Sequence, residues 1–340
     1  MAEKGGKIDL NKVVMKEVKV ENAVGLALAH DLTQIIPGKF KGRLFKKGHV
    51  IREEDIPKLL DIGKGHIYIL DLPEENIHED EAAQRMAKAI GGENLYVVGP
   101  SEGKMTIKSE IDGLLKINEK VIHQINSLQG IALSTLTTNR PVKKNAAVSG
   151  VRQIPLILEE SIIREVESIC QEHSYVVKVI PFRALKVGMV TTGSEVYEGR
   201  IQDKFGPVVK KKVEDFDSKI VEQCFAPDQT EIIESKIKYL LDQEVDLILV
   251  TGGMSVDPDD RTPLAIKNTG AEIIRYGIPM LPGSMMLISY YNDIPILGLP
   301  GCVMHDPYTS FDVFLPRILA GEKITEKDIV TLGYGGFHTC

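Results

Sequence analysis

Residues Asp246-Leu-Ile-Leu-Val-Thr-Gly-Gly-Met-Ser-Val-Asp-Pro-Asp-Asp-Arg-Thr-Pro263 decide the fold of the second half of this chain. The stretch opens with four consecutive apolar residues, 247–250, a run that is typical of a strand buried on both faces of a parallel sheet. Gly252 and Gly253 follow at once. Because glycine lacks a Cβ, the backbone can turn sharply there and approach a ligand closely. We therefore expect a buried strand that ends in a glycine turn.

An acidic loop and a helix start come after this turn. The carboxylates of Asp257, Asp259 and Asp260 lie close together in the sequence. Thr262 and Pro263 suit the cap and the first position of a helix. In an open α/β sheet, ligands bind where parallel strands end and the next helices begin. The pattern predicts a ligand site at this strand end, and an acidic loop exposed to solvent is the alternative interpretation.

Two further segments make the pattern specific. Val190-Thr-Thr-Gly-Ser-Glu-Val196, with Asp203 downstream, precedes the acidic loop, and Leu297-Gly-Leu-Pro-Gly-Cys302 follows it. In this order the three segments resemble the motifs of the molybdopterin-binding domain used in molybdenum-cofactor biosynthesis. That domain occurs in molybdopterin molybdenumtransferases, which the chain resembles most, in molybdopterin adenylyltransferases and in CinA-like nucleotide hydrolases. The resemblance covers roughly residues 185–320.

The resemblance implies which residues meet the ligand. Asp260 matches the recurring acid of the family and is the first expected catalytic residue, with Asp259 as the second. Because carboxylates repel a phosphorylated ligand, we expect Mg²⁺, held by these two acids, to bridge carboxylate and phosphate oxygens. The positions expected to bind the pterin and its phosphate are Thr192, Gly193, Ser194, Glu195, Asp203, Thr251, Gly252, Gly253, Ser255, Arg261, Thr262, Gly298, Pro300, Gly301 and Cys302.

Several positions have a purely structural alternative. Residues 192–194 can form a simple turn, and Asp203 can cap the following helix instead of contacting a ligand. Cys302 stands where the family has Asn, and its thiol either packs inertly or contacts the sulfur or molybdenum of the cofactor. Lys210-Lys211-Lys212 either contacts phosphate or forms a stripe that faces solvent. Met280-Leu-Pro-Gly-Ser284 resembles a family loop whose two lysines are missing here.

Composition narrows the class of protein. The net charge of −7 argues against a broad nucleic-acid-binding face. The sequence contains no secretory signal core and no apolar run long enough to cross a bilayer, so we expect a cytoplasmic location without membrane insertion. Cys170, Cys224, Cys302 and Cys340 are far apart and form no Cys-x-x-Cys pair, which argues against a disulfide framework or a zinc knuckle.

At 340 residues the chain is too long for one compact core, and its patterns divide it into four parts. We expect an N-terminal α+β segment at 1–75 and a β-rich accessory region at 76–180 that passes into a βαβ unit. An α/β domain at 181–322 and a C-terminal tail at 323–340 follow. From about residue 151 strands and helices alternate, which predicts a three-layer, mostly parallel sheet flanked by helices.

The finer element pattern of the α/β domain adds two expectations. Apolar residues at Val213, Phe216, Ile220 and Cys224 predict one long helix over about 208–225. The runs on either side of Asn292-Asp293 predict a hairpin.

The expected function follows from the resemblance. It implies a transferase that binds molybdopterin or adenylyl-molybdopterin and promotes insertion of molybdate with release of AMP. The alternatives are a molybdopterin adenylyltransferase that uses MgATP, a nucleotide hydrolase, and a carrier without catalytic activity that delivers the cofactor to a molybdoenzyme. Related domains form homo-oligomers, so we expect a homodimer with residues 1–180 at its interface.

Overall fold

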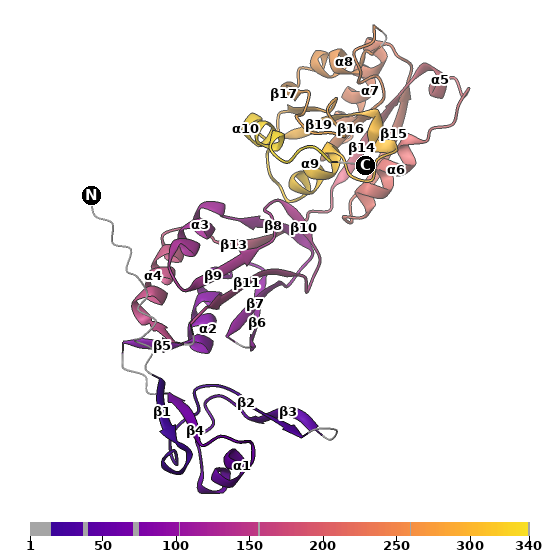
Figure 1. Ribbon diagram of the computed structural model, residues 1–340. Coiled ribbons are helices and arrows are strands. Elements are labelled where there is room, and N and C mark those ends of the chain that lie inside the picture. The colour runs from indigo at the N-terminus through magenta and orange to yellow at the C-terminus, as the bar shows by residue number, and fades with distance from the viewer. Residues whose placement is uncertain are drawn as a thin grey trace.

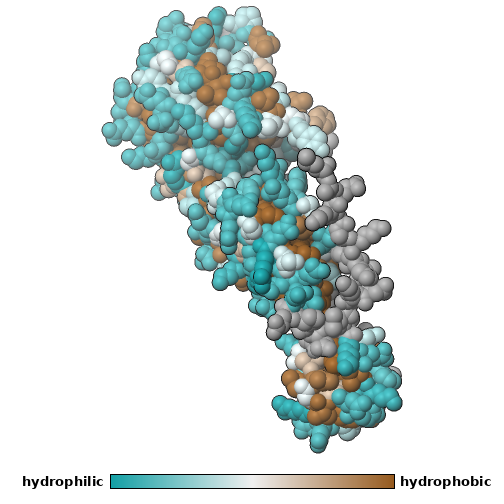
Figure 2. All heavy atoms as spheres, turned by 90° about the vertical axis from the view of Figure 1, so that its left-hand side faces the viewer, coloured by the Kyte–Doolittle hydropathy of each residue, from teal (hydrophilic) through white to brown (hydrophobic). Residues whose placement is uncertain are grey.

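The computed structural model describes residues 15–36, 40–70, 75–101, 103–155, 157–258 and 260–338. These residues form three lobes arranged end to end (Figure 1). Figure 2 shows the same elongated arrangement, with a mostly hydrophilic surface and small, scattered apolar patches on the face in view. The buried apolar clusters separate in the same way, into residues 20–69, 77–179 and 185–329. We propose domain boundaries near residues 75 and 180, which agree with this separation.

The first lobe is small and is built from two antiparallel strand pairs, β1 with β4 and β2 with β3. Its core is the apolar cluster around Leu28, Ile51 and Leu59. An ion pair between Lys47 and Glu79, 2.7 Å long, links it to the second lobe. The elements are β1 (Met15–Lys19), η2 (Val20–Asn22), β2 (Leu32–Ile36), β3 (Phe40–Phe45), η3 (Glu53–Asp55), α1 (Ile56–Asp61) and β4 (His66–Leu70).

The second lobe is rich in β-structure, as the sequence predicts, and helices cover it. Its four-stranded sheet has the order β6-β7-β11-β9, and a three-stranded sheet has the order β10-β8-β13. The helix α3 falls inside the stretch expected to be mainly strands. The elements are β5 (Asn76–His78), α2 (Glu79–Ile90), β6 (Leu95–Ser101), β7 (Lys104–Ser109), β8 (Gly113–Ile117), α3 (Glu119–Ser127), β9 (Ile131–Thr135), β10 (Arg140–Val142), β11 (Ala147–Gln153), β12 (Ile157–Glu159), α4 (Glu160–Gln171) and β13 (Val177–Pro181).

The third lobe is the predicted three-layer α/β domain. Its sheet has the order β15-β14-β16-β19-β18-β17, in which β15, β14, β16 and β19 are parallel and β18 runs antiparallel to both of its neighbours, β19 and β17. Helices α6 and α9 pack on one face of the sheet, and α7 and α8 pack on the other. The predicted hairpin joins β18 to β19 through Asn292, whose φ is +54°.

The bounds of this lobe's elements are β14 (Lys186–Thr192), α5 (Ser194–Tyr197), α6 (Phe205–Glu214), β15 (Lys219–Ala226), α7 (Thr230–Asp242), β16 (Leu247–Thr251), α8 (Thr262–Asn268), β17 (Glu272–Tyr276), β18 (Leu287–Tyr291), β19 (Ile294–Leu299), η4 (Gly301–Met304), α9 (Ser310–Leu319), α10 (Glu326–Val330) and η5 (Thr331–Gly333).

The single long helix expected over 208–225 was wrong. The helix α6 ends at Glu214, and the edge strand β15 begins at Lys219 and pairs in parallel with β14. Between them Asp217 adopts a φ of +58°, which a helix does not allow, and the Ser218 hydroxyl accepts a hydrogen bond from the Leu185 amide. The apolar residues after this turn happen to continue a helical spacing, although they belong to a strand.

The segment expected as a tail, 323–340, is packed against the third lobe as far as the structure describes it. Ile324 and Ile329 are fully or almost fully buried in the same cluster as Phe311 and Phe314. Glu322, just before this segment, forms ion pairs with Arg317 and with Lys116 of the second lobe. In the part of the chain that the structure describes, no helix has the length and apolar character needed to span a bilayer.

Candidate functional site

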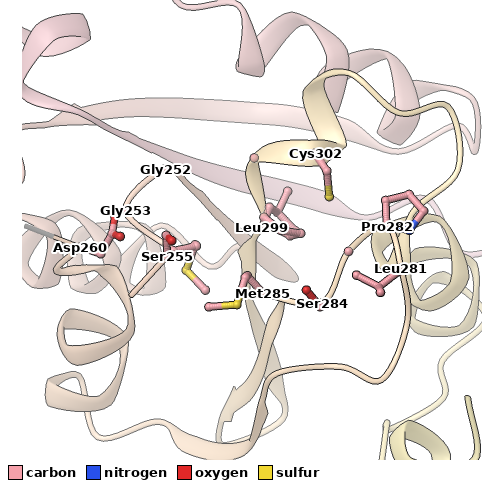
Figure 3. A pocket seen from close by; sticks show the side chains of 14 residues that line it. Gly252, Gly253, Ser255, Asp260, Leu281, Pro282, Ser284, Met285, Leu299 and Cys302 are labelled. Atoms are coloured by element: carbon pink, nitrogen blue, oxygen red, sulfur yellow. The ribbon is translucent and has the colours of Figure 1, made fainter. Parts of the chain in front are cut away.

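A cavity of about 470 Å³ lies at the carboxyl ends of β16 and β19. Three loops form it: the acidic loop after β16, the loop before β18, and the closing loop after β19. Figure 3 shows Asp260 at one end of the cavity and Leu281 and Pro282 at the other. The lining residues are Gly252, Gly253, Met254, Ser255, Asp260, Leu281, Pro282, Gly283, Ser284, Met285, Leu299, Pro300, Gly301 and Cys302.

The glycine turn of the acidic loop has the conformation that the sequence predicts. Gly252 has a φ of +87° and Gly253 a φ of +58°, both in the left-handed region. A Cβ on Gly252 would lie 2.6 Å from the carbonyl oxygen of Thr192, so the backbones of the two strand ends meet without room for a side chain. This close approach places the main chain of residues 252–255 along the cavity.

Thr262 stabilises the turn in a different way from the cap that we expected. The hydroxyl of Thr262 donates a 2.8 Å hydrogen bond to the carbonyl oxygen of Gly252, and Arg261 occupies the cap position of α8. Thr262 is fully buried, and its hydroxyl also lies 3.4 Å from that of Thr192. The contact closes the base of the loop, because residue 262 reaches back across ten positions of the sequence.

Asp260 is the charged residue of the cavity lining in the described part of the chain. Its carboxylate accepts a 3.1 Å hydrogen bond from the amide of Asp257, which fixes the carboxylate beside the cavity. Asp257 itself is exposed, and Asp259 lies outside the described residues. The side chain of Arg261 is also exposed and lies outside the lining.

The donor set has a bearing on metal binding. Within the described ranges, no group of three or more His, Cys, Asp or Glu side chains gathers closely enough to hold a metal ion. A magnesium ion needs fewer protein ligands than three, because it commonly uses one or two carboxylates and completes its coordination shell with water and substrate phosphates. The carboxylate of Asp260 fits that partial role, and it offers the hard oxygen ligands that Mg²⁺ prefers.

The loop before β18 forms a wall of the cavity that sequence reasoning left out of the predicted site. Gly283 has a φ of +117°, and a Cβ there would lie 2.6 Å from the amide nitrogen of Ser310. The buried hydroxyl of Ser310 donates a 2.7 Å hydrogen bond to the carbonyl oxygen of Gly283, so the start of α9 holds this wall. The Pro282-Gly283 pair was the available signal, since such pairs mark sharp turns.

The closing loop contributes Pro300, Gly301 and Cys302 to the lining. The carbonyl oxygen of Cys302 accepts hydrogen bonds from the amides of His305 and Asp306, at 2.9 and 2.8 Å. Figure 3 shows the sulfur of Cys302 on the cavity side of the loop. Gly298 lies outside the lining. A Cβ at this position would be 2.6 Å from the sulfur of Met254. Gly298 therefore makes room for a side chain that does line the cavity.

The motif after β14 serves the fold in this structure. The amide and hydroxyl of Ser194 donate hydrogen bonds of 2.8 and 3.0 Å to the carboxylate of Asp228, and Glu195 is exposed. Gly193 has a φ of +135° and permits this turn. None of these described residues is in the cavity lining, and Thr192 contributes indirectly through Gly252 and Thr262.

Asp203 caps a helix, which was one of the two interpretations left open by the sequence. Its Oδ1 accepts hydrogen bonds from the amides of Phe205 and Gly206, both 2.9 Å long, at the start of α6. Its Oδ2 accepts a 2.8 Å bond from the side-chain amide of Gln223, which also donates to the hydroxyl of Thr191. The carboxylate is thereby surrounded by donors from its own protein.

Thr251 and the lysine triplet complete the expected positions. Thr251 ends β16, and its hydroxyl oxygen is buried without a hydrogen-bond partner in the described structure. Lys212 forms a 2.5 Å ion pair with Asp312, and Lys210 lies 3.9 Å from Glu214. Lys211 and Lys212 line a second cavity of about 360 Å³, and all three lysines lie outside the lining of the first.

The strand order and the cavity position define a class of protein: an α/β domain with a cavity where its parallel strands end, which is where ligands bind in open α/β sheets. Residues 188–320 match the family described as "Probable molybdopterin binding domain". Residues 17–71 match a second family, which is described as a domain of unknown function.

Two kinds of curated relatives share sequence with the chain. A CinA-like protein from Mycobacterium marinum is 31% identical over 90 residues, which is 26% of this chain and 21% of the relative. The chain thus spans about a fifth of the length of that relative. A molybdopterin molybdenumtransferase from Staphylococcus epidermidis is 24% identical over 351 aligned positions, which cover 94% of this chain and 77% of the relative.

Solved structures give looser matches. The MoeA protein of molybdopterin biosynthesis from Pyrococcus horikosii covers 90% of this chain at 13% identity, with a TM-score of 0.34, and 75% of that protein is matched. A MoaB enzyme of molybdopterin biosynthesis from Thermus covers 41% of the chain at 22% identity, also with a TM-score of 0.34, and 98% of that protein is matched. Both superpositions are loose, so the fold assignment rests on the strand order described above.

Proposed function

We propose that this protein acts in molybdenum-cofactor biosynthesis as a molybdopterin molybdenumtransferase-like enzyme. It binds molybdopterin or adenylyl-molybdopterin in the cavity at the ends of β16 and β19 and promotes the insertion of molybdate. One observation carries the proposal. The acidic loop and the closing loop, which carry two of the family's three motifs, converge on a single cavity that contains the carboxylate of Asp260. The alignment with a molybdopterin molybdenumtransferase along 94% of the chain supports it.

The residues of the cavity have distinct roles in this proposal. The main chain at Gly252 and Gly253 lies against the ligand, because neither residue has a side chain to keep it away. The apolar surfaces of Met285 and Leu299 pack against the flat pterin, and Cys302 offers a soft sulfur to the dithiolene end. These contacts bind and orient the ligand.

The role of Asp260 is electrostatic. The described lining holds no basic side chain, so the phosphate of the ligand meets a carboxylate instead of a cation. Asp260, with Asp259 as a second candidate, would hold Mg²⁺, and the ion would offset the charge of phosphate or molybdate oxygens. By holding the ion, Asp260 would keep its positive charge at a fixed place while AMP leaves.

The assembly and the setting are part of the same proposal. The enzyme is a cytoplasmic homodimer in which residues 1–180 contribute to the interface, and its product passes to a recipient molybdoenzyme. Neither nucleic acid nor a membrane is a partner. Light scattering at micromolar concentration tests the dimer, and a monomeric mass would contradict it.

The central test measures binding and chemistry separately. The purified protein is titrated with molybdopterin, adenylyl-molybdopterin, ATP and a nucleoside diphosphate sugar, and release of AMP is then followed after addition of molybdate and Mg²⁺. We expect the two pterins to bind more tightly than the nucleotides, and AMP to appear only when molybdate is present. Tight ATP binding with transfer of AMP to molybdopterin would identify an adenylyltransferase, and pterin binding without AMP release would identify a carrier.

A nucleotide hydrolase is the second candidate, because the CinA-like protein is 31% identical to part of this chain. Its acidic motif resembles residues 257–262 here. Hydrolysis of the nucleoside diphosphate sugar in the same assay, in the absence of pterin and molybdate, would favour this candidate over the transferase.

A further inference from the structure

Tyr276 connects two parts of the third lobe that are distant in the sheet. It is the last residue of β17, the edge strand, whereas the acidic loop follows β16, three positions away in the strand order. The hydroxyl of Tyr276 donates a 2.8 Å hydrogen bond to the carbonyl oxygen of Met254 and lies 3.2 Å from the carbonyl oxygen of Ser255. Tyr276 thus reaches over β18 and β19 to the main chain of the acidic loop.

This contact holds the part of the loop that the other hydrogen bonds leave out. Thr262 closes the base of the loop through the carbonyl oxygen of Gly252. At the tip, the carboxylate of Asp260 is bound to the amide of Asp257. Residues 254 and 255 lie between these two points, and both of their carbonyl groups point to Tyr276.

Met254 belongs to the acidic loop through its main chain and to the cavity wall through its side chain. Its side chain is 4% exposed and occupies the space above Gly298, where a Cβ would lie 2.6 Å from its sulfur. A shift of the Met254 main chain would therefore either push this side chain into β19 or withdraw it from the cavity wall. Holding the Met254 carbonyl keeps both the wall and the acidic loop at a fixed separation from the closing loop.

The phenol is suited to act as a lasting donor. Burial, followed by the negative charge of Asp260, raises the pKa of Tyr276 above its ordinary value. The hydroxyl consequently keeps its proton throughout the neutral range and can donate to the loop.

We propose that Tyr276 is a positioning residue, whose hydroxyl fixes the main chain at Met254 and Ser255 so that Asp260 meets the ligand in the productive geometry. The identity of that ligand rests on the proposed function, whereas the restraint on the loop does not. Tyr276 itself lies outside the cavity lining and touches the site through the main chain of Met254.

The test compares Tyr276→Phe with wild type and with Tyr239→Phe, a matched control on the exposed face of α7. Hydrogen exchange of the ligand-free proteins is expected to become about fivefold faster at the hydrogen-bonded amides of Asp257 and Asp260 in Tyr276→Phe alone, as for the loss of one hydrogen bond. Exchange in β16 should stay unchanged and serves as the check that the fold is intact. Single-turnover AMP release should slow by about fivefold to tenfold at saturating ligand, while affinity stays within about twofold.

The outcomes separate the two proposals. Equal exchange at the amides of Asp257 and Asp260 in Tyr276→Phe and in wild type would overturn the positioning role. A lower melting temperature with an unchanged rate of AMP release from the folded protein would also overturn it, because that result describes a merely structural hydrogen bond. Faster loop exchange in a protein whose wild type releases no AMP would retain the restraint and overturn the proposed function instead.

Discussion

The third lobe contains two glycine turns that look alike in sequence and serve different ends. One follows β16 at Gly252 and Gly253, and the other follows β14 at Gly193. Both come after parallel strands that are buried except for Lys186 at the start of β14, and all three glycines have a positive φ. The first turn brings its main chain into the cavity, whereas the described residues of the second stay outside the lining.

The difference lies in where the polar groups after each turn find their partners. After β14, Ser194 is bonded to Asp228, and Asp203 is bonded to the amides at the start of α6 and to Gln223. After β16, the carboxylate of Asp260 has one hydrogen bond, to the amide of its own loop at Asp257. A polar residue that is already saturated by its own fold has little left to offer a ligand. We therefore propose that the motif after β16 carries the chemistry and that the motif after β14 supports the fold.

The largest expected effect tests the chemistry of the β16 turn. In Asp260→Asn the size of the side chain is kept and its charge is removed. We expect activation of an apo-molybdoenzyme by adenylyl-molybdopterin and molybdate to fall by about two orders of magnitude, as is typical for loss of an electrostatic catalytic group. Pterin affinity, measured by titration, should change little.

Asp257→Asn is the matched control, because Asp257 belongs to the same loop but is exposed and lies outside the lining. Its main-chain amide, which binds Asp260, is unaffected by the substitution. Activation equal to wild type in Asp260→Asn would remove this carboxylate from the mechanism. It would also erase the functional contrast between the two turns.

The next prediction compares how much a glycine-to-alanine substitution in each of the two turns lowers the free energy of unfolding. In Gly252→Ala the new Cβ would meet the Thr192 carbonyl oxygen at 2.6 Å, and main chain cannot move aside easily. We expect a loss of about 3 kcal/mol in the free energy of unfolding, from strain at positive φ plus this clash. In Gly193→Ala the nearest atoms belong to the flexible, exposed side chain of Glu195, so the loss should be smaller.

Gly199→Ala isolates the conformational cost, because Gly199 has a φ of +72° and no atom within 4 Å of the added Cβ. About 1 kcal/mol is expected there, and urea denaturation of all three variants measures the series. Equal losses in Gly252→Ala and Gly199→Ala would show that the close approach of the two strand ends has no energetic weight.

Much of this lobe could be predicted because its sequence patterns are local. The apolar run at 247–250 and the hairpin at Asn292 each depend on neighbouring residues alone, and both were confirmed. The strand β15 could not be recognised in the same way. Its apolar residues continue the spacing of α6, and the distinguishing feature is the turn at Asp217, beside which Ser218 contacts Leu185 of a distant segment.

In the cavity, too, the features that local motifs encode were predictable, whereas contacts between distant segments were not. The acidic loop and the closing loop were expected from their motifs, and the structure brings both into one lining. The wall at Gly283 depends on Ser310, and the loop restraint depends on Tyr276, which is 22 positions from Met254. Neither contact has a sequence signature, because each joins segments that meet only after the sheet and α9 have assembled.

The smallest effect concerns Asp203, which tests whether the β14 motif is supporting structure. In Asp203→Ala the amides of Phe205 and Gly206 lose their acceptor, and the side-chain amide of Gln223 loses one of its two. Loss of a helix cap of this kind costs about 1–2 kcal/mol, so the melting temperature should fall. Below the new transition the folded protein should bind molybdopterin within about twofold of wild type, because Asp203 lies outside the cavity lining.

Asp203→Asn, which retains one acceptor oxygen for the helix amides, should recover part of the stability. If instead Asp203→Ala abolished pterin binding at temperatures where the protein is fully folded, Asp203 would be a ligand contact, and the β14 turn would take part in recognition as the β16 turn does.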